Sequence, residues 1–236
     1  MSETAAPPNS SGTSPVSAPR IALRTAVILL TFTLVFTALM AGVHQLTQPV
    51  LQATAADAKR RLIAEVLPPG AYDNDLLADA LDLPPTAELG TTEVTRLYRA
   101  RKNGEPAALV FEAAAPDGYS GRIGLILAVR ADGRLAAVRV TQHKETPGLG
   151  DYIDPKKDKN KAAPWIAQFA GRSLTDPPAD RWRVKKDGGI FDQRAGATIS
   201  ARAVTHATAR ALAWALAHGE RLYSLPASTT YQENSK

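Results

Sequence analysis

The sequence predicts an α+β protein: one N-terminal transmembrane helix, followed by one domain with an antiparallel sheet and flanking helices. First, residues 25–43 form an apolar run without a charged side chain. Second, Asn103-Gly104 and Asp132-Gly133 each separate two strand-like runs, which is typical of β-hairpins. Third, an Ala-rich amphipathic pattern over 201–218 predicts a long helix. Strands in succession, followed by a helix, are typical of the α+β class.

Composition limits the function classes. The 236 residues and the hydrophobic fraction of 44% are sufficient for one domain with a real core. The net charge is +5, but the basic residues are scattered and only 6% of residues are aromatic, so we expect no nucleic-acid partner. The absence of cysteine excludes disulfides, iron–sulfur clusters and thiolate-bound zinc. A redox role would therefore need an organic cofactor or a site without thiols.

The N-terminal region divides into a tail and an anchor. Residues 1–19 are rich in Ser, Pro and Ala and are predicted to be a disordered tail. Residues 20–45 are predicted to be the anchor, because the apolar run 25–43 would span roughly 28 Å as a helix. A cleaved signal peptide would have a shorter apolar region. Arg20 and Arg24 precede the span, which indicates a cytoplasmic N-terminus and a soluble domain on the other side of the membrane.

The rest of the chain is predicted to form a connecting segment, a domain and a tail. The helical connecting segment covers 46–90, the domain 91–225 and the C-terminal tail 226–236. The expected elements are helices over 51–66 and 74–81, strands over 93–101, 106–113, 122–130, 134–142 and 181–186, a short helix over 165–169, and a last helix over 201–218 that Gly219 closes. The buried stripe of the last helix is expected to be Val204, Ala207, Ala211, Leu212 and Ala215.

The stretch G-A-T-I-S, residues 196–200, stands at the start of this last helix. Thr198 or Ser200 can cap the helix, and the free N–H groups of its first turn can bind an anion. A phosphate placed there would lie beside the Thr198 hydroxyl, and Gly196 permits close approach of the backbone. On spacing alone, a plain helix cap explains the stretch more often than a ligand site.

Two upstream stretches allow a planar ligand. In the loop 143–154, Glu145 can accept a hydrogen bond from a ring N–H, and Leu149 can cover a ring face. Tyr119 could stack on the same ligand. An ordinary turn and a half-buried strand residue explain these features as well. His143 and Glu145 lack a third partner, so we expect no metal site.

A further stretch, P-K-K-D-K-N-K over 155–161, carries four lysines. We interpret it as a solvated loop, with a docking patch for an acidic partner as the alternative.

Three motifs occur in a specific order ahead of the last helix. G-Y-S-G lies at 118–121, H-K-E-T-P-G-L-G at 143–150 and F-D-Q-R-A-G-A-T at 191–198. In this order they resemble the FMN-binding domain family. More narrowly, the chain resembles the G subunits of Rnf-type ion-translocating electron transport complexes, to which the C subunits of the sodium-pumping NADH:quinone reductases are related. The likeness covers nearly everything from the anchor to the final helix.

The resemblance implies FMN bound covalently, through a phosphoester to Thr198, the last residue of a motif that starts at Asp192. A separate flavin transferase would attach the FMN, so Thr198 would be an attachment point, and the resemblance assigns no catalytic residue. Ala195 stands where the family usually has serine or threonine. Lys144 is expected near the ring, where its charge would stabilise an anionic flavin. The cofactor-binding residues implied are Tyr119, Ser120, Gly121, Glu145, Thr146, Gly148, Leu149, Gly150, Gly196, Ala197, Thr198 and Ser200.

The function implied is that of a membrane-anchored flavoprotein subunit of a translocase. It would transfer electrons within an Rnf-type complex of the bacterial inner membrane, which couples ferredoxin/NAD redox chemistry to ion translocation. Its partners would be the other subunits and the flavin transferase, its soluble domain would be periplasmic, and it is not expected to turn over alone. The alternative is an anchored extracytoplasmic module that binds a ligand or a protein without redox activity. A hydrolase is disfavoured, because no His with an orienting acid lies at a recognisable spacing from Thr198 or Ser200.

Overall fold

The computed structural model describes residues 18–232, and the chain forms two compact units, 1–55 and 56–236. Helix α1 (Ala18–Ala64) begins in the first unit and ends in the second. Residues 1–17 of the expected N-terminal tail, and 233–236 of the expected C-terminal tail, lie outside the described residues. The boundaries expected at residues 45, 90 and 225, between the anchor, the connecting segment, the domain and the C-terminal tail, stay predictions.

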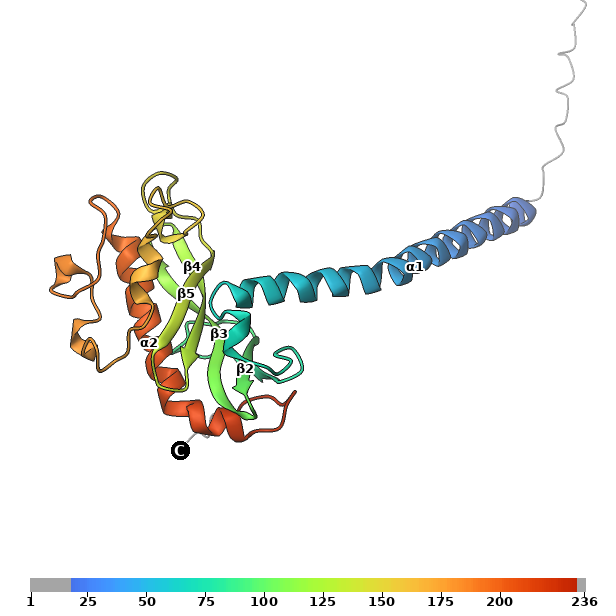
Figure 1. The fold of residues 1–236 in the computed structure, drawn as a ribbon. Helices are drawn as coiled ribbons and strands as arrows, with labels where there is room; N and C mark the ends of the chain where they lie inside the picture. The colour runs from blue at the N-terminus through green and yellow to red at the C-terminus, as the bar shows by residue number, and fades with distance from the viewer. Residues whose placement is uncertain (1–17, 233–236) are drawn as a thin grey trace, which may run out of the picture. The chain divides into compact units, whose positions relative to one another are not determined.

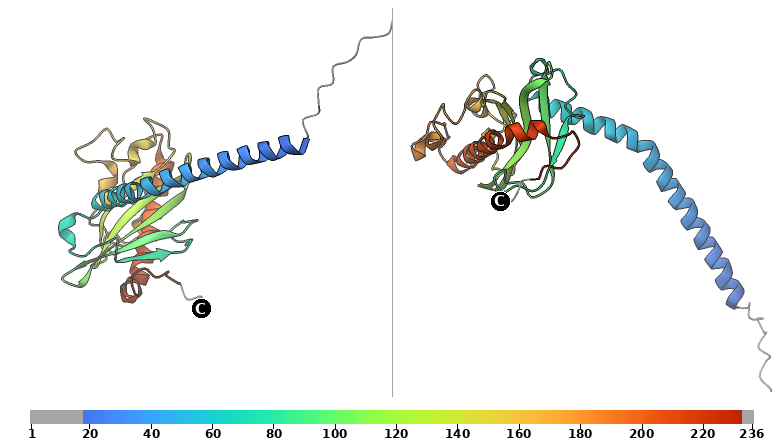
Figure 2. Two further views of the ribbon diagram at one scale, coloured as in Figure 1. Left: turned by 90° about the vertical axis from the view of Figure 1, so that its right-hand side faces the viewer. Right: turned by 90° about the horizontal axis from the view of Figure 1, so that it is seen from below.

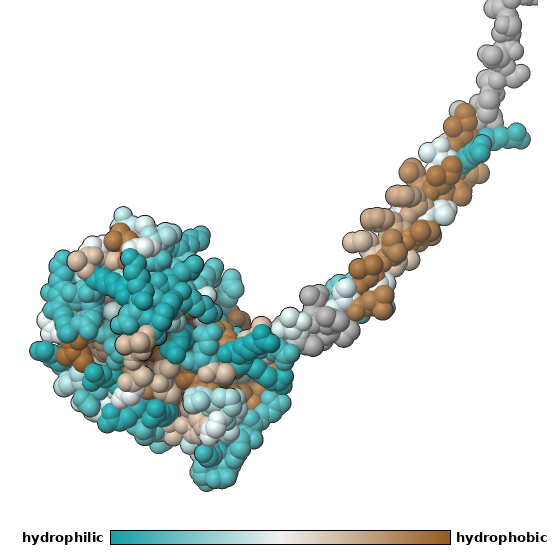
Figure 3. Space-filling view, turned by 45° about the horizontal axis from the view of Figure 1, so that its top comes forward, coloured by the Kyte–Doolittle hydropathy of each residue, from teal (hydrophilic) through white to brown (hydrophobic). Residues whose placement is uncertain are grey.

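In the described residues, the first unit contains an apolar helix. Within α1, Pro19–Gln48 is long and apolar enough to cross a membrane. Its most apolar window of 18 residues has a mean hydropathy of 2.4, and none of that window is buried. Its exposed apolar side chains are coloured brown in Figure 3. The Thr31 hydroxyl donates to the Val27 carbonyl oxygen at 2.8 Å. Such a bond gives the hydroxyl a hydrogen-bond partner within its own helix, which a polar group in apolar surroundings needs.

The second unit contains a five-stranded antiparallel sheet in the order β1-β2-β3-β4-β5 (Figure 1). The strands are β1 (Ala80–Leu83), β2 (Thr95–Lys102), β3 (Glu105–Gly118), β4 (Gly121–Arg130) and β5 (Leu135–Gln142). Asn103 and Gly104 join β2 to β3 with φ of 53° and 83°, the positive values that a type I′ hairpin turn needs. The antiparallel pairing of β2 with β3, and of β4 with β5, confirms both predicted hairpins.

Both faces of the sheet are covered. Helix α2 (Thr198–Ser224) lies along one face (Figures 1 and 2), where its Leu212 joins a core with Phe111 and Leu127. The C-terminal end of α1 covers part of the other face, where Ile63 joins a second cluster with Val110. Short 3₁₀ helices complete the unit: η1 (Pro69–Ala71), η2 (Asp151–Ile153), η3 (Trp165–Phe169), η4 (Ala179–Arg181) and η5 (Lys185–Asp187). The short helix expected over 165–169 is thus confirmed.

The helix expected over 74–81 is wrong. Asn74 binds the edge of β2 instead: its side-chain oxygen accepts from the Arg101 N–H at 2.8 Å, and its Nδ2 donates to the Arg99 carbonyl oxygen at 2.9 Å. Such side-chain bonds compete with helix formation. The chain then enters β1, which pairs with β2 inside the segment expected to be helical.

The strand expected over 181–186 is also wrong. Trp182 and Val184 are buried and alternate with exposed residues, which imitates a strand pattern. The backbone instead forms η4 and η5, with a single bridge between Val184 and Phe191.

Helix α2 is longer than predicted. It begins three residues earlier and continues through Gly219 to Ser224. The buried guanidinium of Arg99 donates to the carbonyl oxygens of Leu222 and Leu225, and so satisfies the end of the extended helix. The predicted buried stripe of α2 is confirmed in full. Tyr231, in the expected tail, is only 1% exposed, so packing continues past residue 225.

Candidate functional site

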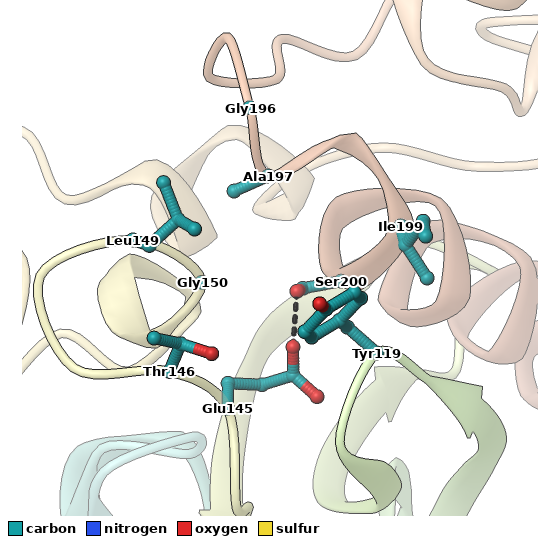
Figure 4. A pocket seen from close by; sticks show the side chains of 9 residues that line it. All are labelled: Tyr119, Glu145, Thr146, Leu149, Gly150, Gly196, Ala197, Ile199 and Ser200. Carbon is teal, nitrogen blue, oxygen red and sulfur yellow. Dashed lines mark hydrogen bonds between the residues drawn. The ribbon is translucent and has the colours of Figure 1, made fainter.

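A cavity of about 110 Å³ lies where three segments of the second unit meet (Figure 4). The segments are the tip of the β3–β4 hairpin, the loop that follows β5 and the first turn of α2. The lining residues are Tyr119, Glu145, Thr146, Leu149, Gly150, Gly196, Ala197, Ile199 and Ser200. Tertiary structure thus brings together residues from all three sequence motifs.

Glu145 links these three segments. Its side chain is 4% exposed, and the Ser200 hydroxyl of α2 donates to its Oε2. The backbone N–H of Ser120, at the hairpin tip, donates to its Oε1 at 3.1 Å. A carboxylate has about four acceptor positions, so capacity for a further donor is left. The expected bond from a ring N–H to Glu145 stays a prediction.

In the loop after β5, glycine is needed at two positions for different physical reasons. A Cβ atom at Gly150 would lie 2.8 Å from Ser200 Oγ and 2.9 Å from Glu145 Oε2, so a side chain there would displace one of these two hydrogen-bonded groups. Gly148 has open space around it, but its φ is +74°, a conformation that other residues rarely adopt. The first glycine permits the contact of the loop with α2, and the second permits its turn.

An apolar rim surrounds the cavity. Tyr119, Leu149 and Ile199 are 65%, 45% and 44% exposed. Single exposed apolar side chains are ordinary, but a group of them around one cavity is typical of a binding site. Figure 4 shows that these three side chains come from the hairpin, the loop and α2, one from each segment. Ile199 was missed in the sequence analysis, although an apolar residue off the buried stripe of α2 was a detectable signal.

Thr198 is the first residue of α2, and no side chain caps the helix. Its hydroxyl has no hydrogen-bond partner among residues 18–232, while Ser200 donates to Glu145 and not to the helix. The expectation that one of them caps α2 is therefore wrong. Thr198 is half-buried and is not itself a lining residue, but it stands between Ala197 and Ile199, which both line the cavity.

A turn over Arg194–Ala197 precedes Thr198. The Ala197 N–H donates to the Arg194 carbonyl oxygen at 3.2 Å, and Gly196 has φ of +80° at the third position, as a type II turn requires. Ala195 is exposed and lines no cavity found in the described part of the chain. The residue that departs from the family pattern is thus exposed to solvent in the turn before Thr198.

The remaining expected residues lie outside the first cavity. A second, more polar cavity of about 490 Å³ is lined by Ser120, Gly121 and Lys144, among others. Lys144 therefore lines this second cavity and not the first one. Asp192 is exposed, and its Oδ1 lies 2.5 Å from Lys185 Nζ. Within residues 18–232, no three His, Asp or Glu side chains form a group that could hold a metal ion.

Sequence reasoning also missed the residues that hold the Arg194–Ala197 turn. The Tyr152 hydroxyl accepts from the Arg194 N–H at 3.2 Å and donates to the Ala197 carbonyl oxygen at 3.1 Å. Burial raises the pKa of Tyr152, so the hydroxyl keeps the proton that it donates. Asp158, interpreted as part of a solvated loop, is 0% exposed and is paired with Arg194.

Comparison with known proteins places these features in a family. The model of the FMN-binding domain matches residues 118–213, and the model of the RnfG N-terminal region matches residues 16–66. The chain is 45% identical over 203 residues to the G subunit of an ion-translocating oxidoreductase complex of Pseudomonas aeruginosa, covering 86% of this chain and 92% of that one.

Other relatives carry the same name. The Photorhabdus laumondii protein is 41% identical, covering 86% of this chain and 94% of its own. The protein of Escherichia coli O157:H7 is 42% identical, covering 81% and 89%. With an FMN-binding domain that contains all three motifs and an apolar N-terminal helix, the chain belongs to the G subunits of ion-translocating oxidoreductase complexes.

Proposed function

We propose that this protein carries FMN as a phosphoester on Thr198 and transfers electrons within its membrane complex. The observation that carries the proposal is the Thr198 hydroxyl. It has no partner in the described part of the chain, and it stands at the uncapped N-terminus of α2, between two residues that line the cavity. Backbone N–H groups and the positive end of the helix dipole stabilise a phosphate at such a place.

The residues present fit a flavin. The cavity of about 110 Å³ is smaller than the 300 Å³ or more of a pocket that encloses a ligand, so a tricyclic ring would lie across the rim. Tyr119, Leu149 and Ile199 offer apolar contacts for its faces. Because these side chains are exposed, the site is open to a partner subunit, with which a bound flavin would exchange electrons.

In this proposal the cofactor and the protein have different roles. The flavin supplies the electron chemistry, and the protein supplies position and electrostatics. Glu145 holds the hairpin, the loop and α2 together, and its side chain would lie beside a ring bound at this cavity.

Attachment needs an activated phosphoryl donor, and a flavin dinucleotide is the class that supplies one. The Thr198 oxygen forms a bond to the FMN phosphorus, and the bond from that phosphorus to the bridging oxygen breaks. A nucleoside monophosphate leaves with the electron pair, and the hydroxyl proton passes to a base of the transferase. No oxidation or reduction occurs in this step.

The apolar part of α1 anchors the protein in the inner membrane in this proposal. Arg20 and Arg24 precede the span and orient the N-terminus toward the cytoplasm. The FMN-binding domain is then periplasmic, where a covalent bond retains a cofactor that has no free pool. Coupling of ferredoxin/NAD redox chemistry to ion translocation belongs to the whole complex.

Intact mass and in-gel flavin fluorescence test the proposal. The full chain, produced together with a flavin transferase and then denatured, is expected to gain the mass of one FMN less water. Thr198→Ala should lose both signals, while Thr198→Ser, which keeps a hydroxyl, should retain some labelling. Covalent flavin on Thr198→Ala would contradict the site. A colourless wild-type protein would favour a binding module without redox activity.

A further inference from the structure

Asp158 occupies an unusual position for a carboxylate. It lies in the lysine-rich loop 155–161, in which all four lysines are at least partly exposed, yet Asp158 itself is 0% exposed. Its Oδ2 accepts the Trp165 N–H at 2.7 Å, and its Oδ1 accepts the Asn160 N–H at 2.9 Å. A buried carboxylate needs such partners, since its desolvation is unfavourable.

The third partner of Asp158 comes from the segment before Thr198. Arg194 Nη2 donates to Asp158 Oδ1, and the guanidinium lies 4.5 Å from the centre of the Tyr152 ring. Tyr152, only 1% exposed, bonds both ends of the Arg194–Ala197 turn. Asp158 and Tyr152 therefore fix the side chain and the backbone of the same turn.

Asp192, which lies just before the turn, is held by Trp165 and Gln168. Trp165 Nε1 donates to the Asp192 carbonyl oxygen at 2.5 Å, and Gln168 Oε1 accepts from the Asp192 N–H at 2.8 Å. Trp165 is also the residue whose backbone N–H binds Asp158. The buried carboxylate thus organises the surface against which the whole segment 192–197 rests.

We propose that Asp158, acting through Arg194, is a positioning residue for flavin attachment: it holds the Arg194–Ala197 turn in the conformation that presents the Thr198 hydroxyl to the transferase. The proposal rests on the proposed function. Phosphoryl transfer needs the attacking oxygen in line with the leaving group, and small misplacements slow such reactions strongly. The fixed turn supplies this alignment before the transferase binds, so the hydroxyl does not have to be ordered during the reaction.

The chain offers a matched control. Arg202 lies four residues after Thr198, as Arg194 lies four residues before it, and Arg202 pairs with Asp187 at 2.6 and 2.8 Å. This pair also ties α2 to a preceding segment, but no bond joins it to the Arg194–Ala197 turn in the described residues. Its loss should reproduce the general effect of removing an ion pair without disturbing the turn.

The test measures initial rates of covalent labelling of the full chain in detergent, with purified transferase and a flavin dinucleotide. Asp158→Asn and Arg194→Gln should each slow labelling about 10-fold or more, and the double variant should be no slower than the single ones. Arg194→Lys, which keeps the charge, should recover part of the rate. Asp187→Asn and Arg202→Gln should label at the wild-type rate.

Hydrogen exchange of the amides of 192–200, without flavin, provides a second measurement. It should accelerate in Asp158→Asn and stay unchanged in Asp187→Asn. Wild-type labelling rates in Asp158→Asn and Arg194→Gln would overturn the positioning role alone. So would slowed labelling with unchanged exchange, or equal slowing in the control variants. Absence of label on the wild-type chain would overturn the proposed function and this inference together.

Discussion

The Ser200 hydroxyl donates a hydrogen bond to the carboxylate of Glu145, a residue 55 positions earlier in the chain. Both side chains are buried, at 1% and 4% exposure. This bond joins the loop after β5 to the first turn of α2, the helix that begins with Thr198. The stability of the site should therefore depend on it.

Ser200→Ala should lower the free energy of unfolding of the domain by about 1–3 kcal/mol, because the Glu145 carboxylate keeps its burial and loses a donor. Denaturant unfolding of the full chain measures this. Ser224→Ala is the control, since Ser224 is exposed and its hydroxyl binds only its own helix, at the Arg221 carbonyl oxygen. Equal effects of the two substitutions would refute the role of the Glu145–Ser200 bond.

Gly150→Ala and Gly219→Ala should change stability in opposite directions. A Cβ at Gly150 would approach the Ser200 and Glu145 side-chain oxygens to within 3 Å, so we expect a loss of about 1–3 kcal/mol. Gly219 is inside α2 with open space around it, and alanine there should add about 0.5–1 kcal/mol through helix propensity. The thermal unfolding midpoint measures both, and a stabilised Gly150→Ala would be incompatible with the packing described.

Arg99→Met should be among the most destabilising single substitutions in the sheet. The Arg99 side chain is 2% exposed, pairs with Asp79 and donates to the C-terminal carbonyl oxygens of α2. Its removal leaves Asp79 and these carbonyl groups short of a partner, at a cost of about 3–5 kcal/mol. Arg96→Met, which breaks a largely exposed pair with Asp82, should change stability by less than about 1 kcal/mol. Comparable losses in urea unfolding would contradict this assignment.

His206 should make the domain less stable in mild acid. Burial lowers its pKa, and Arg210 and Arg202 lower it further, against the opposing effects of Asp117 and Asp187. The unfolded chain then binds more protons than the folded one, so stability falls as the pH drops through the ordinary histidine pKa of about 6.5. His206→Gln should flatten the dependence of the unfolding midpoint between about pH 7.5 and 5.5. If the unfolding midpoint of His206→Gln depended on pH as strongly as that of the wild type, other groups would cause the acid sensitivity.

Titration of Asp158 and Asp187 affects the stability of the domain at a lower pH than titration of His206 does. Burial alone would raise the pKa of Asp158, but the Trp165 and Asn160 N–H groups and Arg194 hold it below its usual value. The hydrogen bonds from Arg202 lower the pKa of Asp187 in the same direction. The stability that these carboxylates contribute is present above a pH of about 4 and is lost as the pH falls through their folded pKa values. Their titration is thus separate from that of His206.

Local patterns in the amino-acid sequence were sufficient to identify the apolar helix, both hairpins, the buried stripe of α2 and the order of the three motifs. These features depend on local composition, on turn residues such as Asn103-Gly104 and on side-chain periodicity, which neighbouring residues carry.

Long-range contacts in the folded chain determine where several of these segments end and which residues hold the site together. The false strand over 181–186 shows the limit, since irregular backbone can bury alternate residues just as a strand does. Helix α2 extends past Gly219 because the distant Arg99 satisfies its last carbonyl groups. Asp158 is buried within a loop of exposed lysines because Arg194, 36 residues later, folds back onto it. Such contacts join residues that local patterns cannot relate, and their free energy comes from burial and pairing in the folded chain alone.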